Sequence, residues 1–132
     1  PFTGSRRVRL SGNTTKMKII YLLINLDDNI DRLSIAASQL QKQSIEFNRV
    51  SAFDGRKLIP DDHPLYNKER SLRYMGRSLV GGEIGCYMSH LQCAENFIAS
   101  DADYAVVLED DCKITNDFNS KIKEILEFLK NL

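Results

Sequence analysis

The sequence predicts an α/β fold built around a mostly parallel sheet, and three observations support this prediction. Three short runs are almost continuously apolar, as expected for strands that are buried on both faces. Helical periodicity of apolar residues follows each run, in one case after a long loop. Strand and helix therefore alternate along the chain, which is typical of parallel sheets with flanking helices. The three runs are Lys18–Asn25, Ile45–Ala52 and Tyr104–Leu108.

Length and composition fit one globular domain. The 132 residues are 42% hydrophobic and 27% charged, which provides enough apolar material for one core. The 18 basic and 18 acidic side chains give a net charge of zero, which argues against a strongly basic nucleic-acid-binding protein. No apolar run approaches the roughly 18 residues of a membrane-spanning helix. We therefore expect neither a nucleic-acid partner nor a transmembrane segment.

The first sixteen residues differ from the rest. Pro1–Lys16 holds four basic residues, no acidic residue and no apolar periodicity, and Met17 then opens directly onto a strand. We interpret residues 1–16 as a disordered, vector-derived leader, with a native basic arm as the alternative. Residues 17–132 then form the domain. Without the leader, 14 basic residues face 18 acidic residues, a net charge of −4.

The first two strands and the helix between them predict one βαβ unit. The strand 18–25 is followed by the polar group 27–29, which suits the N-terminal cap of a helix that extends to about Gln43. The strand 45–52 is closed by the turn 53–55, which contains a glycine. A crossover of this length pairs two strands in parallel. The expected core face of the helix is Ile30, Leu33, Ala37 and Leu40.

The stretch from Arg56 to Gly82 has little regular pattern and predicts a long loop. It contains two prolines, and six basic residues against three acidic ones. This positive excess suits a phosphate-bearing ligand, and a solvated surface loop explains it equally well. A helix is expected from about Glu83 to Ser100. Its expected core face is Ile84, Met88, Leu91 and Ile98, with Glu83, Cys86, His90 and Phe97 on the adjacent flank.

The third strand, Tyr104–Leu108, ends in three consecutive carboxylates, and Thr115–Asp117 then caps a final helix. The apolar stripe of this helix is Phe118, Ile122, Ile125, Leu126 and Leu129. An apolar stripe beside an open sheet favours self-association, so we expect a homodimer. The alternative is a monomer whose stripe packs wholly on its own sheet.

Three cysteines, an odd number without a close CxxC pair, argue against a disulfide framework. Cys86 and Cys93 lie seven residues apart on one predicted helix, which is too far for a disulfide. We therefore expect these residues and Cys112 to be buried free thiols, and we expect a reducing, cytoplasmic location.

The sharpest chemical feature is the triplet Glu109-Asp110-Asp111. Ligands bind at the carboxyl ends of strands in open parallel sheets, and adjacent carboxylates need a compensating cation or hydrogen-bond donors. Oxygen ligands suit Mg²⁺ or Mn²⁺ bridging to the phosphates of a substrate. In an extended segment Glu109 and Asp111 would point the same way, which leaves Asp110 to brace the backbone. The alternative is a solvated acidic turn that caps the following helix.

A second polar cluster, residues 25–28 with Asp31 and Arg32, follows the first strand. If the first and third strands are parallel neighbours, this cluster faces the same crevice as the triplet, where a nucleotide base and ribose would bind. Helix capping and a surface Asp–Arg pair explain the cluster as well.

The segment Gly82-Glu83-Ile84-Gly85 opens a helix, whose free amides could receive an anion. It lacks the lysine and the spacing of a P-loop, and such glycines also serve close packing. His90 is either a general acid or ligand, or a hydrogen-bonded structural residue. The two histidines of the chain are too few for a Ser-His-Asp or zinc motif.

Four segments together resemble glycosyltransferase family 25, the family of bacterial lipooligosaccharide galactosyltransferases and collagen galactosyltransferases. They occur in the family's order across about Met17–Leu132. They are Tyr21-Leu22-Leu23-Ile24-Asn25-Leu26 with Asp31-Arg32, Ser51-Ala52-Phe53-Asp54-Gly55, Gly82-Glu83-Ile84-Gly85-Cys86-Tyr87-Met88-Ser89-His90, and Leu108-Glu109-Asp110-Asp111. The resemblance implies a GT-A-like, Rossmann-like domain. It also implies sugar transfer from a UDP-sugar, with UDP-galactose favoured, to an oligosaccharide or lipooligosaccharide acceptor.

The resemblance further implies roles for individual residues. The triplet would be the family's version of the D-x-D motif, with Glu109 and Asp111 holding Mn²⁺ or Mg²⁺ against the diphosphate. The residues expected to bind the nucleotide sugar are Asn25, Leu26 and Arg32 around the uridine, Asp54 near the base or ribose, and Glu109 and Asp110. The family's lipooligosaccharide enzymes work inside bacteria, which implies the cytoplasm, including the face of the inner membrane.

The chain ends about 20 residues after the triplet, whereas family members continue well beyond it. We therefore expect a donor-binding half that is truncated at the C-terminus, whose activity alone is doubtful and in which no catalytic residue is assigned. One alternative is a non-catalytic nucleotide-binding or assembly module of the same fold. A second is a receiver-type signalling domain, which should also carry a lysine at the end of a later strand.

Overall fold

A computed structural model describes residues 16–132. Apart from Lys16, the predicted leader 1–16 lies outside the described residues. The described part forms an α/β fold, as predicted, with three parallel strands in the order β2-β1-β3. The strands are β1 (Ile19–Asn25), β2 (Asn48–Ser51) and β3 (Tyr104–Glu109). Asn25 lies opposite Ser51 and Ile24 lies opposite Glu109, so all three strands end at one edge of the sheet.

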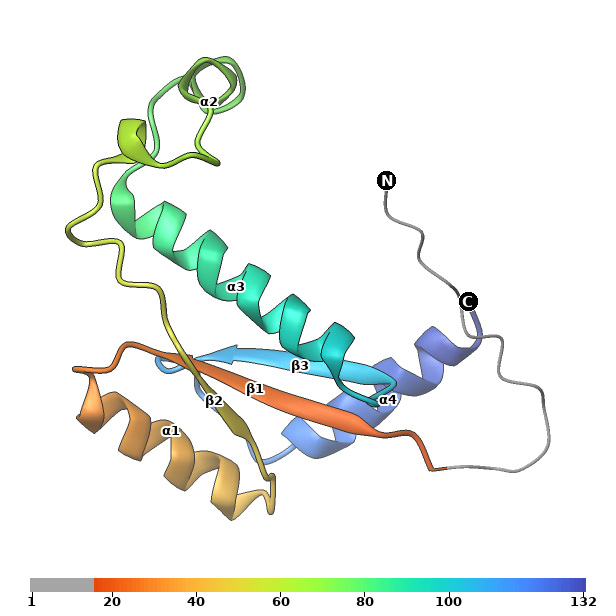
Figure 1. Cartoon of the computed structure of the whole chain (residues 1–132). Helices are drawn as coiled ribbons and strands as arrows, with labels where there is room; N and C mark the ends of the chain where they lie inside the picture. The colour runs from red at the N-terminus through yellow and green to blue at the C-terminus, as the bar shows by residue number, and fades with distance from the viewer. Residues whose placement is uncertain (1–15) are drawn as a thin grey trace.

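Helices cover both faces of this sheet (Figure 1). Helix α3 (Gly81–Ala99) lies over one face, and α1 (Ile30–Lys42) and α4 (Phe118–Lys130) lie on the other. A short helix, α2 (Lys68–Met75), stands beside the start of α3 and away from the sheet. No helix in the described part of the chain is long and apolar enough to cross a membrane.

Two apolar clusters form the core, one on each face of the sheet, because successive residues of a strand point to opposite faces. The cluster under α3 contains Leu22, Ile24, Val50 and Cys93. The cluster on the other face contains Leu23, Ala36, Leu40 and Ile45, with Phe118 of α4 packed against it. The continuous apolar run of β1 therefore supplies both clusters, as predicted for a central strand.

Three predicted details are wrong. The second strand begins at Asn48 rather than Ile45, because it pairs with β1 only along Leu22–Asn25, although Ile45 is buried. Ile30 is exposed at the first position of α1, and Ala36 with Leu40 forms its buried face. Ile98 is 81% exposed, because the buried line of α3 is formed by small residues spaced by four. These residues are Gly85, Ser89 and Cys93.

The stretch 56–82 is more regular than expected. It contains a 3₁₀ turn, Pro60–Asp62, and helix α2. The Asn67 side chain accepts a hydrogen bond from the Arg70 amide at the start of α2, and Gly76 ends the helix at φ 70°, in the left-handed region that favours glycine. Four of the six basic residues of this stretch form ion pairs with acidic residues, which reduces the excess charge available to a phosphate.

Ion pairs and hydrogen bonds attach α2 to α3. The Arg77 guanidinium contacts both Glu83 carboxylate oxygens, at 2.9 and 2.6 Å. The Ser71 hydroxyl donates to the Arg77 carbonyl at 2.7 Å, and the Leu79 amide donates to the Tyr66 hydroxyl at 3.1 Å. These contacts fix the segment 76–80, which connects α2 to α3, and so hold α2 beside the start of α3.

The turn after β2 lies directly against the backbone of α3. A Cβ at Gly85 would lie 2.6 Å from the Phe53 carbonyl oxygen and 2.9 Å from the Gly55 nitrogen, and a Cβ at Gly81 would lie 2.1 Å from the Gly55 carbonyl oxygen. The Ser89 hydroxyl, one turn further along α3, accepts a hydrogen bond from the Phe53 amide at 2.8 Å. Glycine is therefore required where the turn and the helix meet.

We predict that Gly85→Ala lowers the free energy of unfolding by about 1–3 kcal/mol, because the added methyl group would overlap the backbone of the turn. Gly82→Ala is the matched control, since a Cβ there meets no atom within 4 Å. The control should leave stability unchanged or slightly higher, because alanine favours helix. Urea unfolding of both variants tests this, and equal midpoints would contradict the packing described.

Candidate functional site

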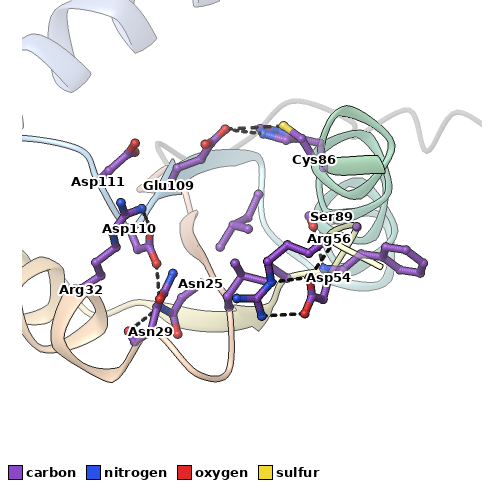
Figure 2. A pocket seen from close by; sticks show the side chains of 17 residues that line it. Asn25, Asn29, Arg32, Asp54, Arg56, Cys86, Ser89, Glu109, Asp110 and Asp111 are labelled. Atoms are coloured by element: carbon purple, nitrogen blue, oxygen red, sulfur yellow. Dashed lines mark hydrogen bonds and ion pairs between the residues drawn. The ribbon is translucent and has the colours of Figure 1, made fainter. Parts of the chain in front are cut away.

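A pocket lies at the carboxyl ends of the strands, between α1, α3 and the turn after β2 (Figure 2). It has a volume of about 210 Å³. Every site residue predicted from the sequence lines it or belongs to its rim. These residues are Asn25, Leu26, Arg32, Asp54, Glu109, Asp110 and Asp111. The fold therefore brings together groups from three segments that are far apart in the sequence, while their roles stay predictions.

Asn25 is the structural centre of this site. Its side chain is buried, and its amide nitrogen donates to the Asn29 carbonyl at 3.0 Å and to the Asp110 carboxylate at 2.7 Å. Its amide oxygen accepts from the Arg49 Nε at 2.9 Å. One side chain thus joins the end of β1, the start of α1, strand β2 and the acidic triplet. Only an amide both donates and accepts in this way.

The three carboxylates of the triplet lie in different environments. Asp110 turns toward Asn25 and Arg32 and its side chain is 10% exposed, with the Arg32 guanidinium 3.5 Å away. Glu109 turns toward α3, and Asp111 is exposed. The triplet does not form the extended segment that was expected, because β3 ends at Glu109 and Asp110 and Asp111 lie in a turn. The Asp110 carboxylate contacts the side chains of Asn25 and Arg32 rather than the backbone, while Glu109 and Asp111 are exposed.

Helix α3 presents Cys86 and His90 to Glu109. The His90 Nε2 lies 3.1 Å from the Glu109 Oε1, and the Cys86 Sγ lies 3.9 Å from the same oxygen. Cys86 is exposed, which corrects the expectation of a buried thiol, whereas Cys93 is buried and Cys112 is half-buried. Desolvation, and then the nearby Glu109 carboxylate, raise the pKa of the Cys86 thiol.

Asp54 and Arg56 form the opposite side of the pocket. The Arg56 guanidinium contacts the two Asp54 oxygens at 2.8 and 2.6 Å and reaches Asp28 at 2.7 Å. Hydrogen bonds from the Arg56 side chain and amide lower the pKa of Asp54 to about 2. Asp54 is therefore ionised at neutral pH, and Arg56 is already paired with two carboxylates.

Sequence reasoning missed Arg56 and Ser89 as residues of this site. Ser89 lies on the predicted helix, and its hydroxyl accepts a hydrogen bond from the Phe53 amide in the turn after β2. Residue spacing along the helix cannot predict a contact with a segment so far away in the sequence. The spacing of four residues correctly predicts that Cys86 and His90 lie on one flank of the helix. That Glu109 lies next to them depends on the tertiary structure and could not be predicted from spacing.

The arrangement offers two kinds of contact to a ligand. Exposed carboxylates at the end of β3 suit a hard divalent cation. The exposed Arg32 and the backbone groups at the ends of β1 and β2 suit the polar edge of a nucleotide, in the position where open α/β sheets bind ligands. The volume is below the 300–1,000 Å³ that is usual for small-molecule pockets.

Comparison with known proteins gives one family. A family model described as glycosyltransferase family 25 (LPS biosynthesis protein) matches residues 17–132. The chain is 31% identical over 109 residues to procollagen galactosyltransferase 2 of Mus musculus, and 30% identical over 109 residues to the Homo sapiens protein of the same name. Each alignment covers 80% of this chain and 17% of the relative.

Another relative carries a different description. The chain is 29% identical over 113 residues to inactive glycosyltransferase 25 family member 3 of Homo sapiens, across 80% of this chain and 18% of that protein. The chain thus spans less than a fifth of the length of these curated relatives. No solved structure gives a significant match to the chain.

We predict that Asn25→Asp lowers the free energy of unfolding by about 2 kcal/mol or more, since it replaces a buried donor by a carboxylate facing Asp110. Asn96→Asp is the matched control, because Asn96 is exposed on α3. The control should stay within about 0.5 kcal/mol of the original chain. Denaturant unfolding at neutral pH measures both, and an Asn25→Asp variant as stable as the control would show that the amide is dispensable.

Proposed function

The chain belongs to glycosyltransferase family 25, and from this membership we propose that its pocket binds the nucleoside-diphosphate sugar from which a galactosyl group is transferred. The receiver-domain alternative is wrong, because the family match covers residues 17–132. The galactosyl preference is supported by the procollagen galactosyltransferases among the relatives. Sugar transfer is part of the proposal only, because the chain covers 17% of the length of these relatives.

One observation carries this proposal. The ends of the three parallel strands, the turn 53–55 and the flank of α3 meet in a single pocket, in which the exposed carboxylates of Glu109 and Asp111 lie together with the guanidinium groups of Arg32 and Arg56. A nucleoside-diphosphate sugar has the matching parts, an anionic diphosphate that needs a cation and a polar base with its ribose. We place the uridine near Asn25, Leu26 and Arg32, and the ribose or base near Asp54.

The chemistry of two exposed side chains supports a hard divalent cation in this proposal. Glu109 and Asp111 are exposed carboxylates at the end of β3, and oxygen donors of this type hold Mg²⁺ or Mn²⁺. A bound cation would neutralise charge on the leaving nucleoside diphosphate. Asp110 takes another role, because Asn25 and Arg32 already engage its carboxylate.

The acceptor is proposed from the family alone. The family description favours a lipopolysaccharide or lipooligosaccharide glycan, in line with the bacterial enzymes that the sequence resembles. A reducing compartment such as the bacterial cytoplasm is part of this proposal, and the three free cysteines support it.

A second candidate function is a non-catalytic module that keeps the donor-binding fold. The observation that favours it is the similarity, at 29% identity, to a relative described as inactive. Such a module would still bind the nucleotide, so binding and transfer have to be measured separately. Release of UDP from UDP-galactose in the presence of an acceptor glycan distinguishes the two candidates.

We predict that UDP binding depends on Mn²⁺ and that Asp111→Asn weakens it by about tenfold or more, because the variant removes one carboxylate ligand. Titration calorimetry of UDP with Mn²⁺, and again with a chelator, measures this. Asp62→Asn is the matched control, because Asp62 is exposed outside the pocket. Equal UDP affinity with and without the metal would overturn the role given to the triplet.

We also propose that two copies of the chain associate through α4. Leu126 is buried, as part of the predicted stripe, but Ile125, Leu129 and the neighbouring Phe128 are exposed, and Phe128 is 66% exposed. The stripe therefore packs only partly on its own sheet, which leaves an apolar surface of the kind that pairs in water.

Light scattering at tens of micromolar should give a mass of about 30 kDa for this dimer, against 15.1 kDa for one chain. Phe128→Glu should return the mass to that of the monomer, because it places a charge in the apolar surface. Ile98→Glu, at an even more exposed apolar position on α3, should not change the mass. A monomer mass for the unmodified chain would refute the dimer.

A further inference from the structure

A soft and a borderline metal ligand, Cys86 and His90, lie beside Glu109, one of the carboxylates already discussed. The Cys86 Sγ, the His90 Nε2 and a Glu109 carboxylate oxygen all lie within 4.8 Å of one another. Cys86 and His90 are four residues apart on α3, so both side chains lie on one face of the helix, and Glu109 reaches them from the end of β3. Figure 2 shows Glu109 and Cys86 turned toward each other across the pocket.

We propose that Cys86, His90 and Glu109 form a binding site for a thiophilic divalent cation, Zn²⁺ being the preferred one. Thiolate, imidazole and carboxylate are the three ligand types that zinc takes in proteins. Mg²⁺ and Mn²⁺ prefer oxygen ligands, so the cysteine and the histidine separate this site from the hard-cation site of the proposed function. The two sites share Glu109 but differ in their other ligands.

The distances between the ligand atoms fit this assignment. In a tetrahedral zinc site with bonds of about 2.0 Å to nitrogen and oxygen and about 2.3 Å to sulfur, nitrogen and oxygen lie about 3.3 Å apart, and sulfur and oxygen about 3.5 Å apart. The corresponding separations here are 3.1 Å and 3.9 Å. Two of the three separations are therefore close to those between adjacent vertices of a tetrahedron, and the third, between the Cys86 Sγ and the His90 Nε2, is within 4.8 Å.

The surroundings of the group also favour a cation. The exposed Asp111 adds a carboxylate near Glu109, which lowers the electrostatic potential at this edge of the sheet. All three ligands line the pocket, so three protein ligands leave a fourth position for water or for a ligand held there, as in zinc sites with an open position. Zinc binding would release the Cys86 thiol proton to solvent and leave the remaining proton of the His90 ring on Nδ1.

Cobalt(II) provides a direct test, because it occupies zinc sites and reports its ligands by absorption. In a buffer with a non-chelating reductant, the whole chain should bind one Co²⁺ with visible bands of tetrahedral cobalt and a thiolate-to-cobalt charge-transfer band, and Zn²⁺ should abolish both. Even outer-shell partners of metal ligands change affinity by about 10–100-fold, so Cys86→Ser and His90→Gln should each weaken cobalt binding by about hundredfold.

Matched controls are available in the chain. Cys112→Ser and His63→Gln replace the same residue types at side chains outside the group, and both should keep the bands and the affinity. Circular dichroism of the metal-free variants checks folding, and because Cys86 and His90 are exposed we expect unchanged spectra. Octahedral cobalt bands only, or equal affinity in the Cys86→Ser and Cys112→Ser variants, would overturn the proposal.

The cobalt titration contains no nucleotide. A failure of metal-dependent UDP binding therefore leaves the zinc site standing, and a chain that binds UDP with Mn²⁺ but shows no tetrahedral cobalt refutes the zinc site alone.

Discussion

The close approach of three glycines is the constraint on which the rest of the site depends. Because Gly55, Gly81 and Gly85 lack side chains, the turn after β2 touches the backbone of α3 directly. The Ser89 hydroxyl then fixes the turn by accepting the Phe53 amide. This contact places the groups of the turn on one side of the pocket and the flank of α3 on the other. A bulkier residue at Gly85 would separate the two walls that define the site.

Asn25 has a similar role at the other side of the pocket. It is 2% exposed, yet each polar atom of its side chain has a partner, and the same is true of every buried side-chain nitrogen and oxygen within residues 16–132. Its contacts with Arg49, Asn29 and Asp110 connect three segments that carry the predicted ligands. The site is therefore held rigidly by neutral and charge-assisted hydrogen bonds before any ligand arrives, which reduces the ordering that binding requires.

Much of this arrangement could be predicted, and the failures have physical causes. Strands β1 and β3 were predicted from their continuous apolar runs, and the start of α4 was predicted from its cap at Asp117. Each of these features depends only on residues that are adjacent in the sequence. Ile98 was misplaced because apolar periodicity ignores small residues, whereas Ser89 and Cys93 let α3 approach the sheet. Helix α2 was missed because its sequence is strongly polar, although Asn67 and Gly76 mark its two ends. The site residues were found because strand ends are recognisable, but Glu109 meets Cys86 only through tertiary structure.

The attachment of α2 has a consequence for how the molecule fluctuates. This helix has eight residues and stands away from the sheet, and its links to the rest run through Arg77, Glu83 and the hydroxyls of Ser71 and Tyr66. A unit held by a few polar contacts opens at a lower free energy than the global unfolding of the core. Amide hydrogens of α2 should therefore exchange with solvent through local opening, while those of β1 exchange only when the whole sheet separates. The pocket, which Gly82 and Cys86 line near the start of α3, therefore lies next to the segment where we expect such opening.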